Sequence, residues 1–295
     1  MNHKFKVDYE KCVKCGLCIE NCPTYALGYD DYKSPKMDKP KNCMECQHCL
    51  AICPVGAISI MDKNPDNSAP IKEINSDDIL NLIQSRRSIR NYKQENVNPK
   101  TIQKLKDMLN FVPTGKNSHA LHFSFIENID VMNDFRTKVN KTLVEVFNKK
   151  PVQFLTKHFS NYEKIKNAIE KGNDVIFRGA PHLVVVSAPI NSACPNQDGI
   201  IALSYFELYA NSLGLGTCWC GYAHRIIKMF PNFSEYLQVP NSYTPIYVML
   251  FGYKNIEYKR TIQPNLFNFT TVEKQDIEIN VLDKVKRFFW NILKP

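Results

Sequence analysis

Eight cysteines near the start of the chain constrain its fold more than any other feature. They form two runs with the same spacing, C-x2-C-x2-C-x3-C, and Pro23 or Pro54 follows directly after each run. A cluster of four irons and four sulfides needs four thiolates that converge from different directions, and this spacing is typical of its ligands. The candidate metal ligands are Cys12, Cys15, Cys18, Cys22, Cys43, Cys46, Cys49 and Cys53.

The spacing also predicts how the two runs share their cysteines. The first three cysteines of a run lie on one tight loop, whereas the short helix after the loop carries the fourth across to the other run. We therefore expect one cluster on Cys12, Cys15, Cys18 and Cys53, and a second on Cys43, Cys46, Cys49 and Cys22. Each proline is expected to start the turn that leads the chain away from its cluster. Over about residues 4–62 the chain closely resembles the two-cluster bacterial ferredoxins.

Two other interpretations of paired cysteines fit less well. Zinc takes its ligands as two pairs, which gives no reason for a third cysteine or for the proline. A disulfide framework would need a secretory context, but the polar stretch Met1–Lys6 is not followed by the apolar segment of a signal peptide. Cys194, Cys218 and Cys220 lie outside both runs, and no window is apolar enough to span a membrane. We expect a protein of a reducing compartment, the cytoplasm.

The net charge of +9 is unevenly distributed along the 295 residues. Residues 1–75 contain ten lysines and ten acidic residues, so the whole positive excess lies in the remainder. Such an excess could bind nucleic acid or an anionic cofactor or substrate, but the lysines are scattered, as on an ordinary solvated surface. We expect no nucleic-acid partner, because neither a helix-turn-helix nor a basic face with spaced aromatic residues is evident.

Composition and periodicity divide the chain into four parts. A domain of residues 1–62 is followed by a polar, proline-containing linker over 63–75. A larger domain spans residues 76–275, and an amphipathic helix spans residues 276–295.

Helices and strands of the larger domain are predicted from hydrophobic spacing. Helices are expected to start at the N-caps Ser76 and Asn98 and to span 130–149, 152–171 and 200–213. Strands are expected over 122–126, 183–186 and 246–251. Few strands, far apart in the sequence among many helices, indicate the α+β class.

A group of arginines carries the strongest chemical signal of the larger domain. Arg86, Arg87 and Arg90 lie with Ser88 within five residues at a predicted helix end. Guanidinium groups bind phosphate through two hydrogen bonds at once, so this group is a candidate phosphate site. Taken alone, the pattern also fits a solvated helix end.

The order of four short motifs strengthens this signal. Arg-Arg-Ser-Ile-Arg-Asn-Tyr at 86–92 is followed by Pro-Thr-Gly-Lys-Asn-Ser-His at 113–119, Gly-Leu-Gly-Thr-Cys-Trp-Cys-Gly at 214–221 and Tyr-Lys-Arg at 258–260. In order and spacing these motifs resemble the FMN-dependent nitroreductase family over about residues 76–262. With the front module, the chain resembles the ferredoxin–nitroreductase fusions of anaerobic bacteria. The resemblance implies a central mixed sheet flanked by helices, FMN as cofactor, and a homodimer with flavin sites at its interface.

The resemblance also implies roles for individual residues. The FMN phosphate and ribityl chain would be held by Arg86, Arg87, Ser88 and Arg90, with Lys259 and Arg260 closing on the same phosphate. A loop that reaches the flavin of the neighbouring subunit would contain Pro113, Thr114, Gly115 and Asn117. Backbone amides of Cys220 and Gly221 would face the isoalloxazine ring near N5 and stabilise reduced flavin. The chain departs from the family at His119-Ala120, where Gln-Pro is common, and carries an extra cation at Lys116.

Some residues allow two interpretations. Cys218 and Cys220 could form a redox or metal pair, although small buried residues beneath the flavin are favoured. His119 could donate a proton above the flavin, whereas His182 is expected to be a strand-end residue and Cys194 to be inert. The basic tail could lie on a membrane surface, although covering the partner subunit is favoured.

We expect an oxidoreductase in which the cofactors carry the chemistry and no side chain is catalytic. A reduced carrier of the ferredoxin or flavodoxin type would give electrons to one cluster, and the second cluster would pass them to FMN. FMN would then deliver them from N5 to a small organic acceptor of the nitroaromatic, quinone or enone type. The alternatives are an electron-transfer protein or a redox-sensing iron–sulfur protein without a small-molecule substrate of its own.

Overall fold

The computed structural model describes residues 3–149 and 160–274, together with Val285 and Trp290. Its contacts divide the chain into two compact units, Met1–Lys259 and Arg260–Pro295. None of the helices in the described ranges is long and apolar enough to cross a membrane. The predicted tail helix over 276–295 lies outside the described residues except for Val285 and Trp290. The domain boundaries predicted at residues 62 and 75 fall within the first unit and stay a prediction.

Residues 3–62 form two similar halves, as the repeated cysteine run requires. β1 (Lys6–Val7) pairs antiparallel with β4 (Ile58–Ser59), and β2 (Leu27–Tyr29) pairs antiparallel with β3 (Pro35–Met37). α1 (Leu17–Glu20) and α2 (His48–Ala51) each follow a residue in left-handed conformation, Gly16 with φ 80° and Gln47 with φ 59°. One 3-10 turn, Pro40–Asn42, lies between β3 and α2, and another, Pro65–Asn67, lies just after β4. The small core contains Leu27, Leu50, Ile58, Ile60, Cys18 and Cys49.

A four-stranded antiparallel sheet forms the centre of the remaining part of the first unit, in the order β5-β6-β8-β7. Its strands are β5 (His122–Ile126), β6 (His182–Pro189), β7 (Leu215–Trp219) and β8 (Tyr243–Tyr253). Leu183–Val186 of β6 is buried on both faces, as its continuous apolar run predicts. A single parallel bridge recorded within the described ranges joins Ser88 to Thr217 at the outer edge of β7.

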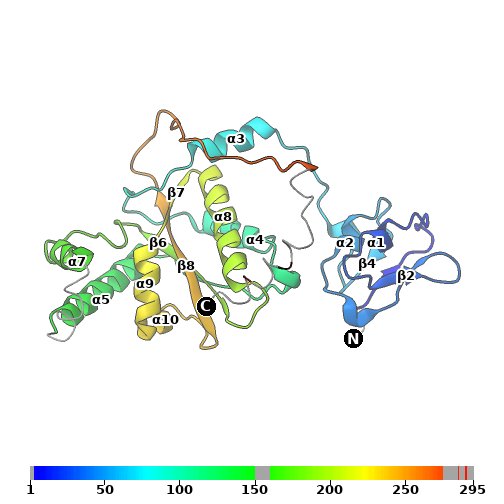
Figure 1. Cartoon of the computed structure of the whole chain (residues 1–295), viewed down its shortest axis with the longest axis horizontal. Helices are drawn as coiled ribbons and strands as arrows, with labels where there is room; N and C mark the ends of the chain where they lie inside the picture. Colours follow the sequence, from blue (N-terminus) through cyan, green and yellow to red (C-terminus); the bar gives the residue numbers. More distant parts are fainter. Residues whose placement is uncertain (1–2, 150–159, 275–284, 286–289, 291–295) are drawn as a thin grey trace. The chain divides into compact units, whose positions relative to one another are not determined.

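Helices cover both faces of this sheet (Figure 1). On one face, α4 (Pro99–Leu109) and α8 (Pro195–Ser212) share a core with Val184 and Met249. On the other, α5 (Ile129–Phe147), α9 (Gly221–Met229) and α10 (Pro231–Tyr236) share a core with Val185 and Leu250. α3 (Ser76–Ser85) contacts α8, and α7 (Ser160–Glu170) contacts α5. This α+β arrangement agrees with the predicted fold class. In the part of the chain that the structure describes, the four strands pair antiparallel, and the predicted mixed character of the sheet is limited to the single parallel bridge at Ser88.

Most predicted elements are present, with shifted ends. The N-cap at Asn98 is confirmed, since its side chain accepts a hydrogen bond from Lys100 N. The N-cap prediction at Ser76 is wrong by one residue: Asn75 caps α3 by accepting from Asp77 N, and Ser76 is the first helical residue. α8 begins at Pro195, whereas the prediction began at residue 200. The prediction missed the start of the helix because that part is polar and has no apolar periodicity. α7 accounts for part of the helix predicted over 152–171, of which residues 152–159 lie outside the described ranges.

Candidate cofactor sites

The eight cysteines of the front region surround two separate cavities. One cavity is lined by Cys12, Cys15, Cys18 and Cys53, and the other by Cys22, Cys43, Cys46 and Cys49. A backbone amide donates to the cysteine that completes each set, with Ala57 N 3.2 Å from Cys53 Sγ and Ala26 N 3.3 Å from Cys22 Sγ. Amide donors to sulfur tune the reduction potential of a cluster. The crossed grouping of cysteines therefore suits two cluster sites.

Each set of cysteines encloses a space rather than converging on one point. Across residues 3–149 and 160–274, no group of three or more His, Cys, Asp or Glu side chains is placed to hold a single metal ion. A zinc ion would need its thiolates about 2.3 Å from one centre. Thiolates spread around a cavity fit a multi-iron cluster instead.

The predicted phosphate-binding string lies along the outer edge of β7. Ile89 N donates to Thr217 O at 2.8 Å, and Tyr92 bridges Lys254 just after β8. Gly216 permits this close approach, because a Cβ there would lie 2.6 Å from Cγ1 of Ile89. The fold thereby brings the motif at 86–92 against the motif at 214–221, although they are far apart in the sequence.

The three arginines of this string have different surroundings. Nη2 of Arg87 is buried and has no hydrogen-bond partner among the described residues. Arg86 donates from Nη1 to Oε1 of Glu207 at 3.1 Å, whereas exposed Arg90 donates from Nη1 to the Ser88 carbonyl at 3.3 Å. A buried cationic nitrogen without an acceptor is costly, so the surroundings of Arg87 fit an anionic group such as phosphate.

Glu207 on α8 is a buried carboxylate that no sequence motif indicated. Its Oε1 atom accepts from Arg86 and, at 3.4 Å, from Oγ1 of Thr217. Its Oε2 atom accepts from Nε1 of Trp219 at 3.0 Å. The available signal was a single acidic residue within the apolar stretch 200–213, since carboxylates are rarely buried without partners.

The turn from β7 into α9 presents the third predicted motif. Cys220 is the N-cap of α9, and its Sγ atom accepts from Ala223 N at 3.4 Å. Gly221 is the first helical residue, so its amide is one of those that a helix cannot satisfy internally. Burial raises the pKa of the Cys220 thiol to about 11 and raises the pKa of Cys218 as well. Both thiols pack in the core on the α9 side, which favours buried small residues over a redox pair.

The loop at 113–119 is fixed by a second buried acid that sequence reasoning missed. Gly115 N donates to Oδ1 of Asp198 at 2.8 Å, and His119 N donates to Oγ1 of Thr114 at 3.0 Å. Asn117 has φ 53°, and its Nδ2 donates to the Met44 carbonyl at 3.1 Å. Its Oδ1 lies 3.1 Å from Nε2 of His119, so this amide side chain has partners on both sides.

The two buried acids hold different predicted segments. Asp198 and Glu207 are nine residues apart on α8, which corresponds to about 13 Å along the helix axis. The loop at 113–119 and Arg86 are therefore fastened near opposite ends of α8. The structure does not bring all predicted flavin contacts together within one chain.

The late basic pair is not tied to the arginine string by any contact recorded among the described residues. Lys259 donates from Nζ to Oε2 of Glu257 at 2.6 Å, and both side chains are exposed. Arg260 is exposed and begins the second unit.

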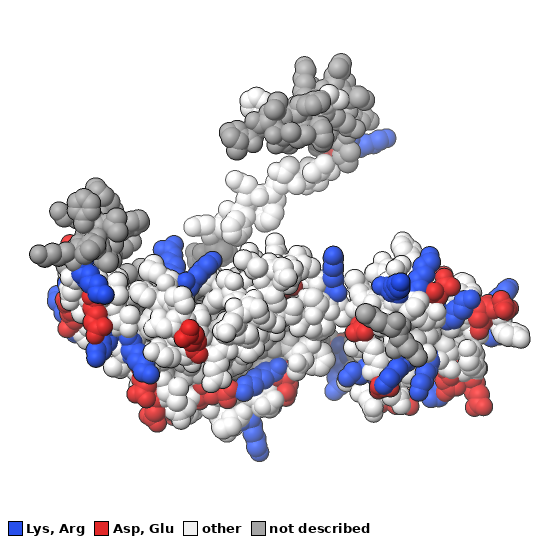
Figure 2. All heavy atoms as spheres, turned by 90° about the horizontal axis from the view of Figure 1, so that it is seen from below, with Lys and Arg blue, Asp and Glu red and all other residues white. Residues whose placement is uncertain are grey.

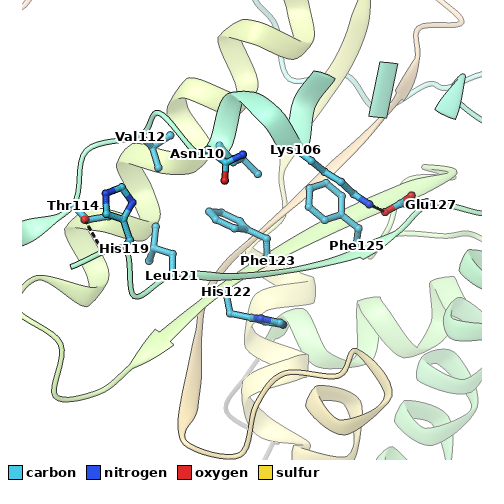
Figure 3. Close-up of a pocket in the computed structure, with 11 residues that line it drawn as sticks. Lys106, Asn110, Val112, Thr114, His119, Leu121, His122, Phe123, Phe125 and Glu127 are labelled. Carbon is cyan, nitrogen blue, oxygen red and sulfur yellow. Dashed lines mark hydrogen bonds and ion pairs between the residues drawn. The ribbon is translucent and has the colours of Figure 1, made fainter. Parts of the chain in front are cut away.

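Two large cavities beside the sheet lie away from the arginines. A cavity of about 490 Å³ lies between α4 and β5 and is lined by Phe123, Phe125 and His119 (Figure 3). Lys106 and Glu127 form an ion pair at one end, and Thr114 lies at the other. A second cavity of about 510 Å³ lies on the α5 side of the same strand. β5 is an edge strand, so these cavities follow an open sheet edge.

Comparison with known proteins identifies the larger domain. The sequence profile of the nitroreductase family matches residues 83–253, more than half of the chain. The chain belongs to the nitroreductase family. The profile of the 4Fe-4S dicluster domain matches residues 11–57, so this nitroreductase-family protein has a ferredoxin-type dicluster domain in front, as predicted.

Solved structures show the same fold. A nitroreductase with bound FMN from Desulfitobacterium hafniense DCB-2 is 24% identical, with a TM-score of 0.53, and the match covers 68% of this chain and 100% of that one. A nitroreductase with bound FMN from Bacteroides fragilis NCTC 9343 is 18% identical, with a TM-score of 0.53, covering 67% of this chain and 100% of that one. A search of curated proteins gave no match. The likeness to solved structures establishes the fold of the nitroreductase domain.

Proposed function

We propose that this nitroreductase-family protein is an FMN-dependent oxidoreductase that passes electrons from two [4Fe-4S] clusters to a small organic acceptor of the nitroaromatic, quinone or enone type. The observation that carries the proposal is the buried Nη2 atom of Arg87, which lacks an acceptor within a motif of FMN-binding type. Two four-cysteine cavities in the same chain supply sites for the electron source. The two FMN-bound nitroreductases described above share the fold.

The residues of this chain would hold and orient the cofactors. The eight cysteines would bind the clusters, and Arg87, Ser88 and Arg90, with Lys259 and Arg260, would receive the FMN phosphate. Arg86, predicted to share the phosphate, is paired with Glu207 instead. The amide of Gly221, the first residue of α9, would donate to the electron-rich edge of the ring. The Cys220 amide, also predicted for this role, donates to the Val248 carbonyl at 2.9 Å instead. When bound, FMN supplies two-electron chemistry that single-electron clusters lack. The side chains therefore contribute binding and electrostatics, and none of them needs to be catalytic.

We propose that the protein forms a homodimer. Asp198 holds the loop at 113–119 at one part of α8, and Glu207 holds Arg86 at another part of the same helix. A complete flavin site would therefore need this loop from a second copy. Apolar side chains at Ile79, Leu80 and Ile83 on α3 are exposed, as are Leu266 and Phe267 in the second unit. Figure 2 shows a broad area without charged groups on one face of the first unit. Sedimentation of the protein should give the mass of a dimer, and a monomer would contradict the shared site.

The cluster on Cys43, Cys46, Cys49 and Cys22 is proposed as the one that passes electrons to the flavin. The Met44 carbonyl, within its loop, accepts the hydrogen bond from Asn117 of the predicted flavin loop. The other cluster would then receive electrons from an external carrier.

Arg87→Ala tests the flavin site. Loss of a hydrogen-bonded charge costs about 1.5–3 kcal/mol, so the dissociation constant for FMN should rise roughly 10- to 100-fold, and Arg87→Lys should recover part of the loss. Flavin fluorescence during titration of the apo-protein measures the constant. Lys100→Ala, an exposed cation on α4, is the control and should bind FMN as the unmodified protein does. Unchanged binding by Arg87→Ala would contradict the assignment.

A second candidate function is electron transfer to another protein without a small-molecule substrate. Its specific support is that the cavity lined by exposed His119 lies along the edge strand β5 and is open to solvent there. Dithionite-reduced protein should be offered nitroaromatic, quinone and enone acceptors under anaerobic conditions. Turnover faster than that of free FMN supports the oxidoreductase. Turnover equal to that of free FMN with every acceptor supports the electron-transfer protein.

A further inference from the structure

We propose that Glu207 is a positioning residue of the flavin site. Its carboxylate joins the phosphate-binding string to the motif at the end of β7, and thereby sets both the affinity for FMN and the reduction potential of the flavin. The inference rests on the proposed function, because it requires FMN to bind beside these two segments.

The carboxylate has donors from both segments. Arg86 contributes Nη1 from the end of α3, while Thr217 and Trp219 contribute Oγ1 and Nε1 from β7. The donors use both oxygens of Glu207, so moving one segment relative to the other would break at least one bond. Glu207 therefore fixes the spacing between the arginine string at 86–92 and strand β7. The backbone contacts of Ser88 and Ile89 with Thr217 join the same two segments.

A neighbouring side chain orients this network. Nδ2 of Asn211, one turn along α8, donates to Oγ1 of Thr217 at 3.1 Å and to the Glu207 carbonyl at 2.9 Å. Because Oγ1 of Thr217 accepts a hydrogen bond from Asn211, its own proton is free to be donated to Glu207. The indole ring of Trp219 packs edge-on against Tyr247, with ring centroids 5.3 Å apart. A buried network in which each member has partners is rigid.

The charge of Glu207 distinguishes it from a purely structural residue. Its side chain is 9% exposed, and that of Arg86 is 34% exposed. The ion pair cancels much of the Arg86 charge. Arg87, whose Nη1 donates to the Arg86 carbonyl, keeps a buried Nη2 without a partner among the described residues. Water screens the more exposed Arg86 more than it screens Glu207, so the pair keeps a net negative field that opposes the gain of negative charge when a nearby flavin is reduced. Glu207 should therefore keep the flavin potential low.

Glu207→Gln tests the proposal because it preserves the shape and removes the charge. In the full chain with both clusters present, we expect the dissociation constant for FMN to rise about tenfold and the flavin midpoint potential to become less negative. Glu207→Asp keeps the charge but is one methylene shorter, so it should weaken FMN binding and leave the potential nearer to that of the unmodified protein. Glu127→Gln, which removes the half-exposed partner of Lys106, is the matched control and should change neither quantity.

Fluorescence adds a readout of Trp219 itself. The chain has two tryptophans, so a Trp290→Phe background leaves Trp219 as the reporter, and Glu207→Gln should shift its emission. If Glu207→Gln binds FMN within twofold of the unmodified protein and has the same potential, the proposal is overturned. If that variant does not fold, Glu207→Asp decides, and unchanged FMN affinity overturns the proposal. Failure of the unmodified protein to bind FMN would instead refute the proposed function itself.

Discussion

At the scale of single residues, the two thiols near the proposed flavin site should be chemically silent. Burial raises the pKa of Cys220 to about 11 and raises that of Cys218, so neither thiol forms much thiolate near neutral pH. Iodoacetamide at pH 8, applied anaerobically to the protein with its clusters, should label partly exposed Cys194 first. Peptide mapping by mass spectrometry measures the order. Labelling of Cys218 or Cys220 as fast as Cys194 would favour a redox pair.

His182 gives the fold a dependence on pH. Burial lowers its pKa from 6.5 to about 4, and its Nε2 atom accepts from Val97 N at 2.9 Å. The unfolded chain binds this proton more readily than the folded chain does. The contribution of neutral His182 to the free energy of unfolding is therefore fully present above pH 6.5 and is lost as the pH falls from 6.5 to about 4. The loss from this group approaches about 1.4 kcal/mol per pH unit.

His182→Gln is the comparison that isolates this effect. Glutamine still offers an oxygen to Val97 N but does not titrate. Unfolding curves at pH 7 and pH 5 should show a smaller loss of stability for the variant than for the unmodified protein. Equal losses would mean that His182 is not held neutral by burial. The interpretation of His182 as a strand-end residue agrees with its place as the first residue of β6.

The candidate site was predictable where single side-chain types carry the chemistry. Eight cysteines at fixed spacing identify themselves, because few other functions need thiols in that pattern. The clustered arginines were a signal only through the order of the four motifs, since alone they also fit a solvated helix end. Glu207 and Asp198 were not predictable, since their roles depend on partners more than eighty residues away, such as Gly115 and Arg86. Only the folded structure shows which donors meet a buried carboxylate.

At the scale of elements, the contact between the arginine string and β7 depends on Gly216. A Cβ at this position would lie 2.6 Å from Ile89 Cγ1 and 2.7 Å from Lys254 Cγ, and Ile89 is buried. Gly216→Ala should therefore cost about 1–3 kcal/mol of stability and displace the string, so that FMN is lost on gel filtration. The absorbance of the eluted protein measures FMN retention.

Gly214→Ala serves as the control for this prediction. Gly214 has φ 81°, so alanine is strained there by about 1 kcal/mol, but a Cβ meets nothing within 4 Å. We expect this variant to be destabilised and to keep its FMN. Equal loss of FMN from both variants would show that stability alone, rather than the contact with Ile89, governs binding.

Elements with strong local signals were predicted, and those without were missed. Asn98 followed by Pro99 indicates a helix start, and the apolar run Leu183–Val186 indicates a buried strand. β7 was missed because Leu215–Trp219 contains glycine and has no alternation of apolar and polar residues. α9 begins directly after it at Gly221, without a linker that would mark the change.

At the scale of the whole molecule, one chain joins two cofactor types. A 4Fe-4S dicluster domain stands before a nitroreductase domain, and the hydrogen bond from Asn117 to the Met44 carbonyl links the loop of one cluster to the predicted flavin loop. Electrons should therefore pass between the cofactors within the protein, without a separate carrier at that step.

Rapid mixing of the fully reduced protein with a nitroaromatic acceptor tests this claim most directly. Flavin absorbance and the electron paramagnetic resonance of the clusters are followed together under anaerobic conditions. If electrons pass within the protein, flavin oxidation should come first, and cluster oxidation should follow at a rate independent of protein concentration. Clusters that stay reduced after the flavin has been oxidised would contradict it.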